Sequence, residues 1–237
     1  MILSHLPGWV PVVFAIAFAG TLLMFFRLLW DVVPSRRKLI AIGIAGAAWI
    51  ALQAAFGLHG VYSGHLDRLP PQLLVFGLLP ALLTIAGVFA TRSGRAMVDR
   101  ISLRRLTLLH TIRIPVEIAL FGLYLGGAVP RLMTFEGGNL DIFSGLSAPL
   151  IGYLAFSKEG NVRRRLLLGW NVVCLALLGN IVVRALGSTP FPFQRFAFEQ
   201  PNVAILHFPF MWLPTVIVPI VLFSHLAAFR QLLRQTR

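Results

Sequence analysis

Long apolar segments, each close to the length that crosses a membrane, dominate this chain of 237 residues. A transmembrane helix needs roughly 20 mainly apolar residues, because the hydrocarbon core of a bilayer is about 30 Å thick. Only 12% of the residues are charged, about half the share found in a soluble domain. We therefore predict an all-α polytopic membrane protein, a single bundle of seven transmembrane helices over residues 1–237 without a separate soluble domain. The predicted spans cover about residues 11–30, 39–58, 71–90, 106–128, 142–156, 166–186 and 207–229.

Lysine and arginine are unevenly distributed between the alternating connections. Fifteen of the 21 basic residues lie after the first, third and fifth predicted spans or in the C-terminal tail, whereas three lie in the other connections. Cytoplasmic connections carry such an excess, so we predict a multi-pass protein of the cell membrane with its N-terminus outside and its C-terminus cytoplasmic. A re-entrant segment at 142–156 would move the arginines of 163–165 outside, so we expect this short segment to span. The fifteen residues are Arg36, Arg37, Lys38, Arg92, Arg95, Arg100, Arg104, Arg105, Lys158, Arg163, Arg164, Arg165, Arg230, Arg234 and Arg237.

The net charge of +13 would indicate a nucleic-acid partner in a soluble protein. Here the basic residues flank apolar segments, and no motif combines basic with aromatic residues as nucleic-acid-binding motifs do. We therefore expect contacts to anionic lipid headgroups on the cytoplasmic side, and no nucleic-acid binding.

Three ionisable residues share one face of the fourth predicted span. His110, Arg113 and Glu117 are spaced at i, i+3 and i+7, a spacing that places all three on the same side of a helix. Ionisable groups are costly in hydrocarbon and normally face the interior of a bundle. At 1.5 Å per residue, Glu117 lies roughly 16 Å into the membrane, near its midplane. Two interpretations remain open: an internal ion pair that fastens this span to its neighbours, or a site coupled to a proton or a small ligand.

The sixth predicted span carries a second polar pair. Asn180 and Arg184 are i, i+4 neighbours, and Arg184 falls near the outer boundary of the membrane. Arg184 would either extend to the headgroups or face the outer mouth of the bundle and attract an anion. Asparagines in membrane helices commonly hydrogen bond to neighbouring helices. We include both residues in the predicted ligand-binding set.

Histidines and carboxylates gather in the connections that we predict to lie outside. His59 and His65 follow the second span, Asp141 precedes the fifth, and His207 opens the seventh. Histidine with carboxylate is a common ligand set for zinc and other divalent metals. The sequence contains none of the usual metal-binding spacings, such as HExxH. An outward-facing divalent metal site is one prediction, and a solvated loop is the alternative.

Haem is a further alternative for the histidines. His207 and His225 are 18 residues apart, which is five helical turns and places them on one face. His59 with His207, and His110 with His225, would then form pairs at two membrane levels, as bis-histidine b-type haems require. Unrelated interfacial histidines would produce the same pattern.

Seven spans with an external N-terminus are also the topology of rhodopsins, but the last predicted span has no lysine. The two lysines, Lys38 and Lys158, lie in connections, so we expect no retinal Schiff base. The favoured expectation is a membrane protein with a polar intramembrane site for small-ligand or ion binding, transport or sensing. A membrane-embedded metal-dependent enzyme, a b-type haem protein and a structural subunit bound to a membrane-protein partner are the alternatives.

Overall fold

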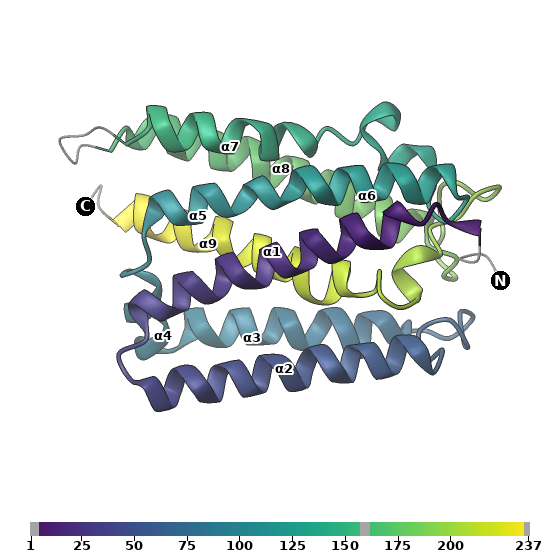
Figure 1. The fold of residues 1–237 in the computed structure, drawn as a ribbon, viewed down its shortest axis with the longest axis horizontal. Coiled ribbons are helices and arrows are strands. Elements are labelled where there is room, and N and C mark those ends of the chain that lie inside the picture. The colour runs from purple at the N-terminus through teal and green to yellow at the C-terminus, as the bar shows by residue number, and fades with distance from the viewer. Residues whose placement is uncertain (1–4, 157–161, 235–237) are drawn as a thin grey trace.

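The computed structural model describes residues 5–156 and 162–234, and this part of the chain forms helices without a β-strand. The long helices run along one common axis (Figure 1). The first long helix begins at one end of the bundle, and the last helix finishes at the opposite end. The all-helical class predicted from the sequence is therefore confirmed.

Helix bounds are as follows. The first half contains α1 (Trp9–Val32), α2 (Arg36–Leu58), the π-helix η2 (Leu73–Leu78), α3 (Leu79–Ala90) and α4 (Arg92–Val98). One long helix is then built from α5 (Leu103–Leu109), the 3₁₀ turn η3 (His110–Ile112) and α6 (Arg113–Leu125). The second half contains α7 (Ile142–Leu154), α8 (Arg164–Ser188), the π-helix η7 (Leu213–Ile217) and α9 (Val218–Arg234). Short 3₁₀ turns lie at Arg131–Met133, Phe135–Gly137 and Ala204–Leu206.

Six of the described helices are long and apolar enough to cross a membrane. They are Trp9–Val32, Arg36–Leu58, Leu73–Ala90, Leu103–Leu125, Arg164–Ser188 and Leu213–Arg234. These six correspond to all the predicted spans except the fifth. At that place the structure has a shorter apolar helix, α7, of 13 residues.

Several helix ends differ from the predicted bounds, including both ends of the last helix, which continues to Arg234. The fourth span was expected to reach residue 128, but α6 ends at Leu125, because Gly127 adopts a left-handed conformation with φ of 76°. Its N–H donates to Tyr124 O, and Ala128 N–H donates to Leu123 O, which is the Schellman pattern that ends many helices. The last span was expected from 207, but regular helix begins only at Leu213.

The helix that contains Pro80 lacks one internal hydrogen bond. A proline nitrogen has no hydrogen, so the carbonyl four residues earlier, Phe76 O, loses its α-helical donor. Gln53 of α2 supplies a replacement, with its Nε2 donating to Phe76 O over 3.1 Å. The hydroxyl of Tyr62 donates to Gln53 Oε1 and holds this amide in place. Tyr62 is buried, and burial raises the pKa of its hydroxyl.

Pro219 has the same effect in α9. The carbonyl four residues before it is Thr215 O, and Trp49 Nε1 of α2 donates to this oxygen over 3.1 Å. In both helices the proline follows a π-helical turn, η2 or η7, and these two turns contact each other. The wider π-helical turns of the two helices are therefore adjacent. In each helix, a side chain of α2 donates a hydrogen bond to the carbonyl that the proline leaves without a backbone donor.

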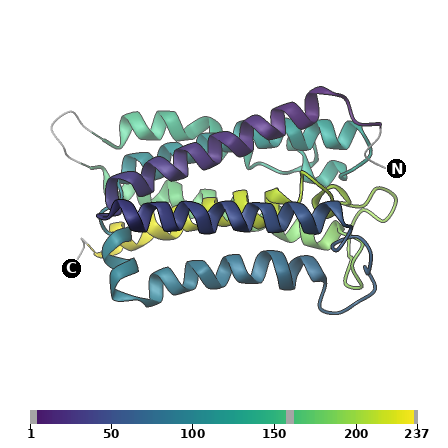
Figure 2. The same cartoon turned by 60° about the horizontal axis from the view of Figure 1, so that its bottom comes forward.

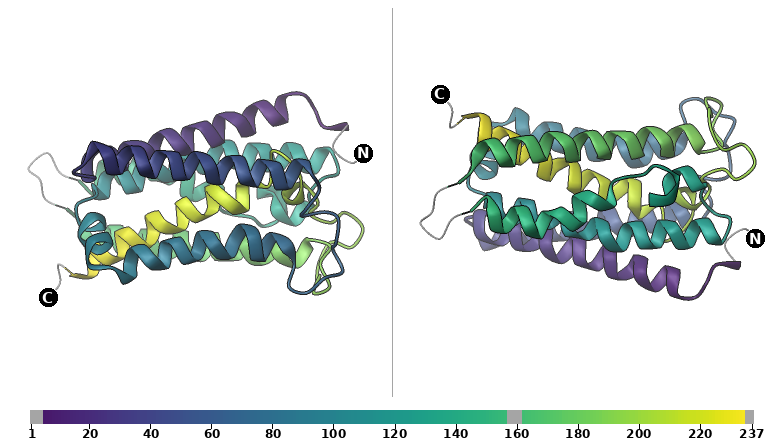
Figure 3. Two further views of the ribbon diagram at one scale, coloured as in Figure 1. Left: turned by 90° about the horizontal axis from the view of Figure 1, so that it is seen from below. Right: turned by 90° about the horizontal axis from the view of Figure 1, so that it is seen from above.

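The core is formed by the helices at the centre of the bundle. α1 packs against α6, α5 against α9 and α7, and α8 against α9. α2 and α3 lie on one side of the bundle (Figure 2), opposite the side that carries α7 and α8 (Figure 3). Few side chains of α2 and α3 are buried, although both helices are strongly apolar. Such exposed apolar faces are suited to contact with lipid.

Candidate functional site

Close packing of α7 brings its first residues to the middle of the bundle. A side chain at Gly145 would lie 2.9 Å from Ile114, and one at Gly152 would lie 3.0 Å from Leu108. Small residues allow such close helix approach in membranes. Asp141, which immediately precedes α7, is thereby placed against Arg113 at the start of α6.

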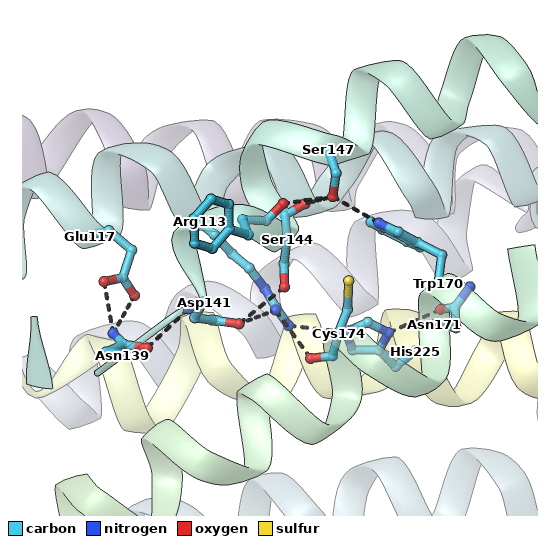
Figure 4. A network of polar contacts seen from close by, with 11 residues as sticks. Arg113, Glu117, Asn139, Asp141, Ser144, Ser147, Trp170, Asn171, Cys174 and His225 are labelled. Atoms are coloured by element: carbon cyan, nitrogen blue, oxygen red, sulfur yellow. Dashed lines mark hydrogen bonds and ion pairs between the residues drawn. The ribbon is translucent and has the colours of Figure 1, made fainter. Parts of the chain in front are cut away.

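Arg113 is the centre of the polar network. It is only 2% exposed and forms an ion pair with Asp141. Its second amino group, NH2, lies 3.0 Å from His225 Nε2, and NH1 also donates to the carbonyl of Cys174 over 3.3 Å. Ser144 Oγ donates to the same Asp141 oxygen over 3.3 Å. Arg113 therefore joins α6, α7, α8 and α9 (Figure 4).

Glu117 lies one turn further along α6 and has no ion-pair partner among the described residues. Asn139 Nδ2 lies 2.7 Å from each of its carboxyl oxygens. The same amide group donates to Met133 O over 3.0 Å, while Asn139 Oδ1 accepts from the backbone N–H of Asp141 over 3.1 Å. Asn139 thus connects the carboxyl group of Glu117 with the backbone of Asp141 (Figure 4).

The segment before α7 folds inward because of its glycines. A side chain at Gly137 would lie 1.8 Å from Arg131 O, and Gly138 has a φ of 96°. A residue other than glycine is strained in both situations. The turn allows Asn139 and Asp141, both buried, to reach the bundle interior. Glu136 in the same turn is exposed.

His225 extends the network toward the opposite end of the bundle. Its Nδ1 lies 2.9 Å from Asn171 Oδ1, so both ring nitrogens have polar partners. The ring stacks on His110 with centroids 4.1 Å apart, and His110 also forms a T-shaped contact with Trp170, with centroids 5.3 Å apart. The Nδ1 atom of His110 is buried without a hydrogen-bond partner in the described part of the chain.

Asn180 and Arg184, the predicted polar pair on α8, contact the glycine turn before α7 and not Arg113. Arg184 Nε donates to Asn180 Oδ1 over 3.0 Å, and Arg184 NH1 donates to Gly137 O over 3.1 Å. Asn180 Nδ2 lies 3.5 Å from Gly138 O. These two side chains therefore hold the glycine turn, and through it they position Asn139 and Asp141.

A cavity of about 80 Å³ lies beside the network. Arg113, Glu117 and Asp141 form the charged part of its wall, and the remaining lining is apolar, from η2, α6, α8, η7 and α9. A single water needs about 10–15 Å³ on this scale. The cavity therefore has room for several waters or for one small ligand next to three ionisable groups.

The charges of the network do not balance. Two buried carboxyl groups, of Glu117 and Asp141, face one guanidinium, of Arg113. An uncompensated charge in the interior of a membrane protein is costly. The network becomes neutral if Glu117 carries a proton or if a cation enters the cavity. The site is therefore chemically suited to exchanging a proton on Glu117 for a cation in the cavity.

The residues predicted to bind a metal do not come together as a three-ligand group in the described part of the chain. His59 and His65 are exposed, His207 is half-buried, and Asp141 belongs to the Arg113 network. Burial lowers the pKa of His207. Within residues 5–156 and 162–234, no group of three or more His, Cys, Asp or Glu is placed to hold a metal ion.

One of the histidine pairs predicted for haem does come together in the structure. His110 and His225 do meet, but their rings stack directly and the nitrogens of His225 are engaged. The two rings would have to separate before both could bind the same iron from opposite sides.

Sequence reasoning identified His110, Arg113 and Glu117 as one face, and the structure buries all three. It connected His225 with that face only through the haem alternative, which pairs His225 with His110. It did not connect Asn171 with the face, although Asn171 occurs in an apolar segment, where polar side chains commonly face other helices. Asn139 lies in the connection that was predicted to be outside, and it was not among the predicted site residues.

The chain belongs to a family described as a domain of unknown function, DUF8737, which matches residues 70–233. This range contains every residue of the Arg113 network and excludes α1 and α2. No curated protein and no solved structure is significantly similar to the chain.

Proposed function

We propose that this member of the DUF8737 family is a seven-span protein of the cell membrane that binds a small ligand or ion in the cavity beside Arg113, with Glu117 gaining or losing a proton in the process. Transport or sensing is the role that such a site would serve. The observation that carries the proposal is the buried carboxyl of Glu117, which borders the cavity and has no ion-pair partner among the described residues.

The proposed topology rests on charge and on the position of α7. α7 runs alongside α8 within the bundle (Figure 3), so it supplies a seventh, shorter crossing in a tilted or locally thin bilayer. With seven crossings, the connections rich in arginine lie at one end of the bundle. The positive-inside rule then makes that end cytoplasmic and the N-terminus external.

The chemistry of the wall restricts the ligand. Most of the lining is apolar, while the guanidinium of Arg113 and the carboxyl of Glu117 offer one cationic and one protonatable group. Arg113 Nε has no hydrogen-bond partner in the described part of the chain. A small molecule with an apolar body and one acceptor group, or a hydrated small ion, fits these features.

The proton on Glu117 is the feature to test. Infrared difference spectroscopy on purified protein in lipid detects a protonated buried carboxyl at neutral pH, and we expect this band in the wild type. Glu117→Gln should remove it and leave the protein folded. Glu136→Gln is the matched control, because Glu136 is exposed on the neighbouring turn, and it should retain the band.

Two outcomes would contradict the proposal. One is a wild-type protein without a protonated carboxyl at neutral pH, and the other is a Glu117→Gln protein that keeps the band. A complementary measurement is ligand-induced thermal stabilisation across a panel of small organic acids, amines and inorganic ions. Stabilisation that depends on pH in the wild type, and that Glu117→Gln abolishes, would identify the ligand class.

A further inference from the structure

A second hollow lies between α3 and α9, away from the Arg113 network. It has a volume of about 670 Å³, within the range of small-molecule sites. Its α3 wall is formed by Leu82, Ile85, Ala86 and Phe89, and its α9 wall by Leu222, Leu226, Leu233 and two arginines. Leu82 and Leu233 are exposed, so the groove is open to the surroundings of the bundle.

The two arginines lie together at one end of this groove. Arg230 donates to both carboxyl oxygens of Asp99, over 2.8 and 2.9 Å, and Arg234 pairs with the same carboxylate. Arg95 is close to this end as well, because its NH1 donates to Phe89 O and Ala90 O over 2.9 and 2.6 Å. Two guanidinium groups thus share one carboxylate, and Arg95 adds a third positive charge near this end, so an excess of positive charge remains.

The dimensions of the groove match one leaflet of a bilayer. Leu222, Leu226, Arg230 and Arg234 follow one another at successive turns of α9, so the groove extends about 18 Å along the helix. Half of the hydrocarbon core is about 15 Å thick. The apolar part therefore lies at the depth of acyl chains, and the arginines lie at the depth of headgroups.

We propose that this groove is a binding site for one anionic phospholipid, with an acyl chain between α3 and α9 and the headgroup phosphate on Arg234 and Arg230. Basic pockets between membrane helices recognise anionic headgroups in this way. Asp99 orients the two guanidinium groups without neutralising both of them. Binding requires both the apolar walls and the positive end. A zwitterionic lipid lacks the net negative charge for the positive end, and free phosphate lacks the acyl chain for the apolar walls.

The test compares two lipids with identical acyl chains on the full-length protein in detergent. Native mass spectrometry should show one dioleoyl phosphatidylglycerol bound per chain, and clearly weaker binding of dioleoyl phosphatidylcholine. Arg234→Gln should weaken phosphatidylglycerol binding about fivefold, the effect of removing one arginine near an anionic headgroup. Arg37→Gln is the control, because Arg37 is an exposed arginine in the first turn of α2, and α2 begins at the end of the bundle where α9 finishes (Figure 1).

A second pair of variants tests the apolar part. Ala86→Trp fills the groove and should abolish the specific binding, whereas Leu83→Trp alters the exposed neighbouring position of α3 and should not. Equal affinity for the two lipids would overturn the proposal. So would wild-type binding by Ala86→Trp, or full displacement of the lipid by inorganic phosphate. Arg234→Gln changes a largely exposed side chain, so it provides a test even if Ala86→Trp does not fold.

Discussion

Removing the single guanidinium from the buried network should destabilise the protein strongly. Arg113→Gln leaves the carboxyl groups of Glu117 and Asp141 without a cation among the described residues, and it removes the bonds to Cys174 O and His225. Breaking a buried ion pair by removing one partner costs about 3–5 kcal/mol. We expect the free energy of unfolding to fall by about this amount at neutral pH.

The double variant separates charge from packing. Arg113→Gln with Asp141→Asn leaves a polar network of similar shape, which is neutral when Glu117 carries its proton, and replacing both partners of a buried pair is often nearly neutral. We expect the double variant to regain at least about 2 kcal/mol relative to Arg113→Gln. The deficit of the single variant should also shrink as the pH is lowered, because protons then neutralise the unpaired carboxylates.

The assay is reversible unfolding of detergent-solubilised protein, followed by circular dichroism, for the wild type, both single variants and the double variant. This double-mutant cycle yields the coupling energy between the two residues. Additive effects, or an Arg113→Gln protein as stable as the wild type, would refute the view that charge compensation holds the four helices together.

Three further predictions concern other parts of the molecule. Gln53→Leu leaves Phe76 O without its side-chain donor and should lower the free energy of unfolding by about 1–3 kcal/mol, measured in the same assay. Burial raises the pKa of Tyr62, so the folded state resists its ionisation. Stability should therefore fall as the pH rises above about 10, the unfolded value, and should fall less in Tyr62→Phe. His59, His65, Asp141 and His207 do not form a three-ligand group in the described part of the chain, so we expect elemental analysis to find clearly less than one zinc or manganese per chain. Stoichiometric metal that is lost in His207→Ala would contradict this expectation.

The periodicity of the sequence was sufficient to find the long helices and the polar face of the fourth span. Helical spacing is local, so His110, Arg113 and Glu117 could be placed together before any tertiary contact was known. The ion pair was harder to predict. Arg113 and Glu117 are i, i+4 neighbours, yet Arg113 pairs with Asp141, because α7 approaches closely at Gly145 and presents that carboxylate directly to the guanidinium.

The inward fold of the segment before α7 could not be predicted from composition. Glu136, Asn139 and Asp141 resemble a solvated polar loop, and one of the three is in fact exposed. Whether such a loop turns inward depends on the residues that it contacts in the bundle. Here these are Glu117 and Arg113, which lie about 20 residues or more earlier in the chain. A single sequence contains no direct information on contacts at that separation.

The donors that α2 provides have a mechanical consequence. α2 packs loosely, yet Gln53 and Trp49 bond to the weakest points of two other helices, the carbonyls freed by Pro80 and Pro219. The π-turns beside these points, η2 and η7, contribute to the cavity wall. If α2 moved away, both helices would lose support at one level, and their kinks could bend together. α2 therefore supports both kinked helices from the periphery of the bundle. A contact that displaced α2 at the protein surface could change the volume of the cavity beside Arg113.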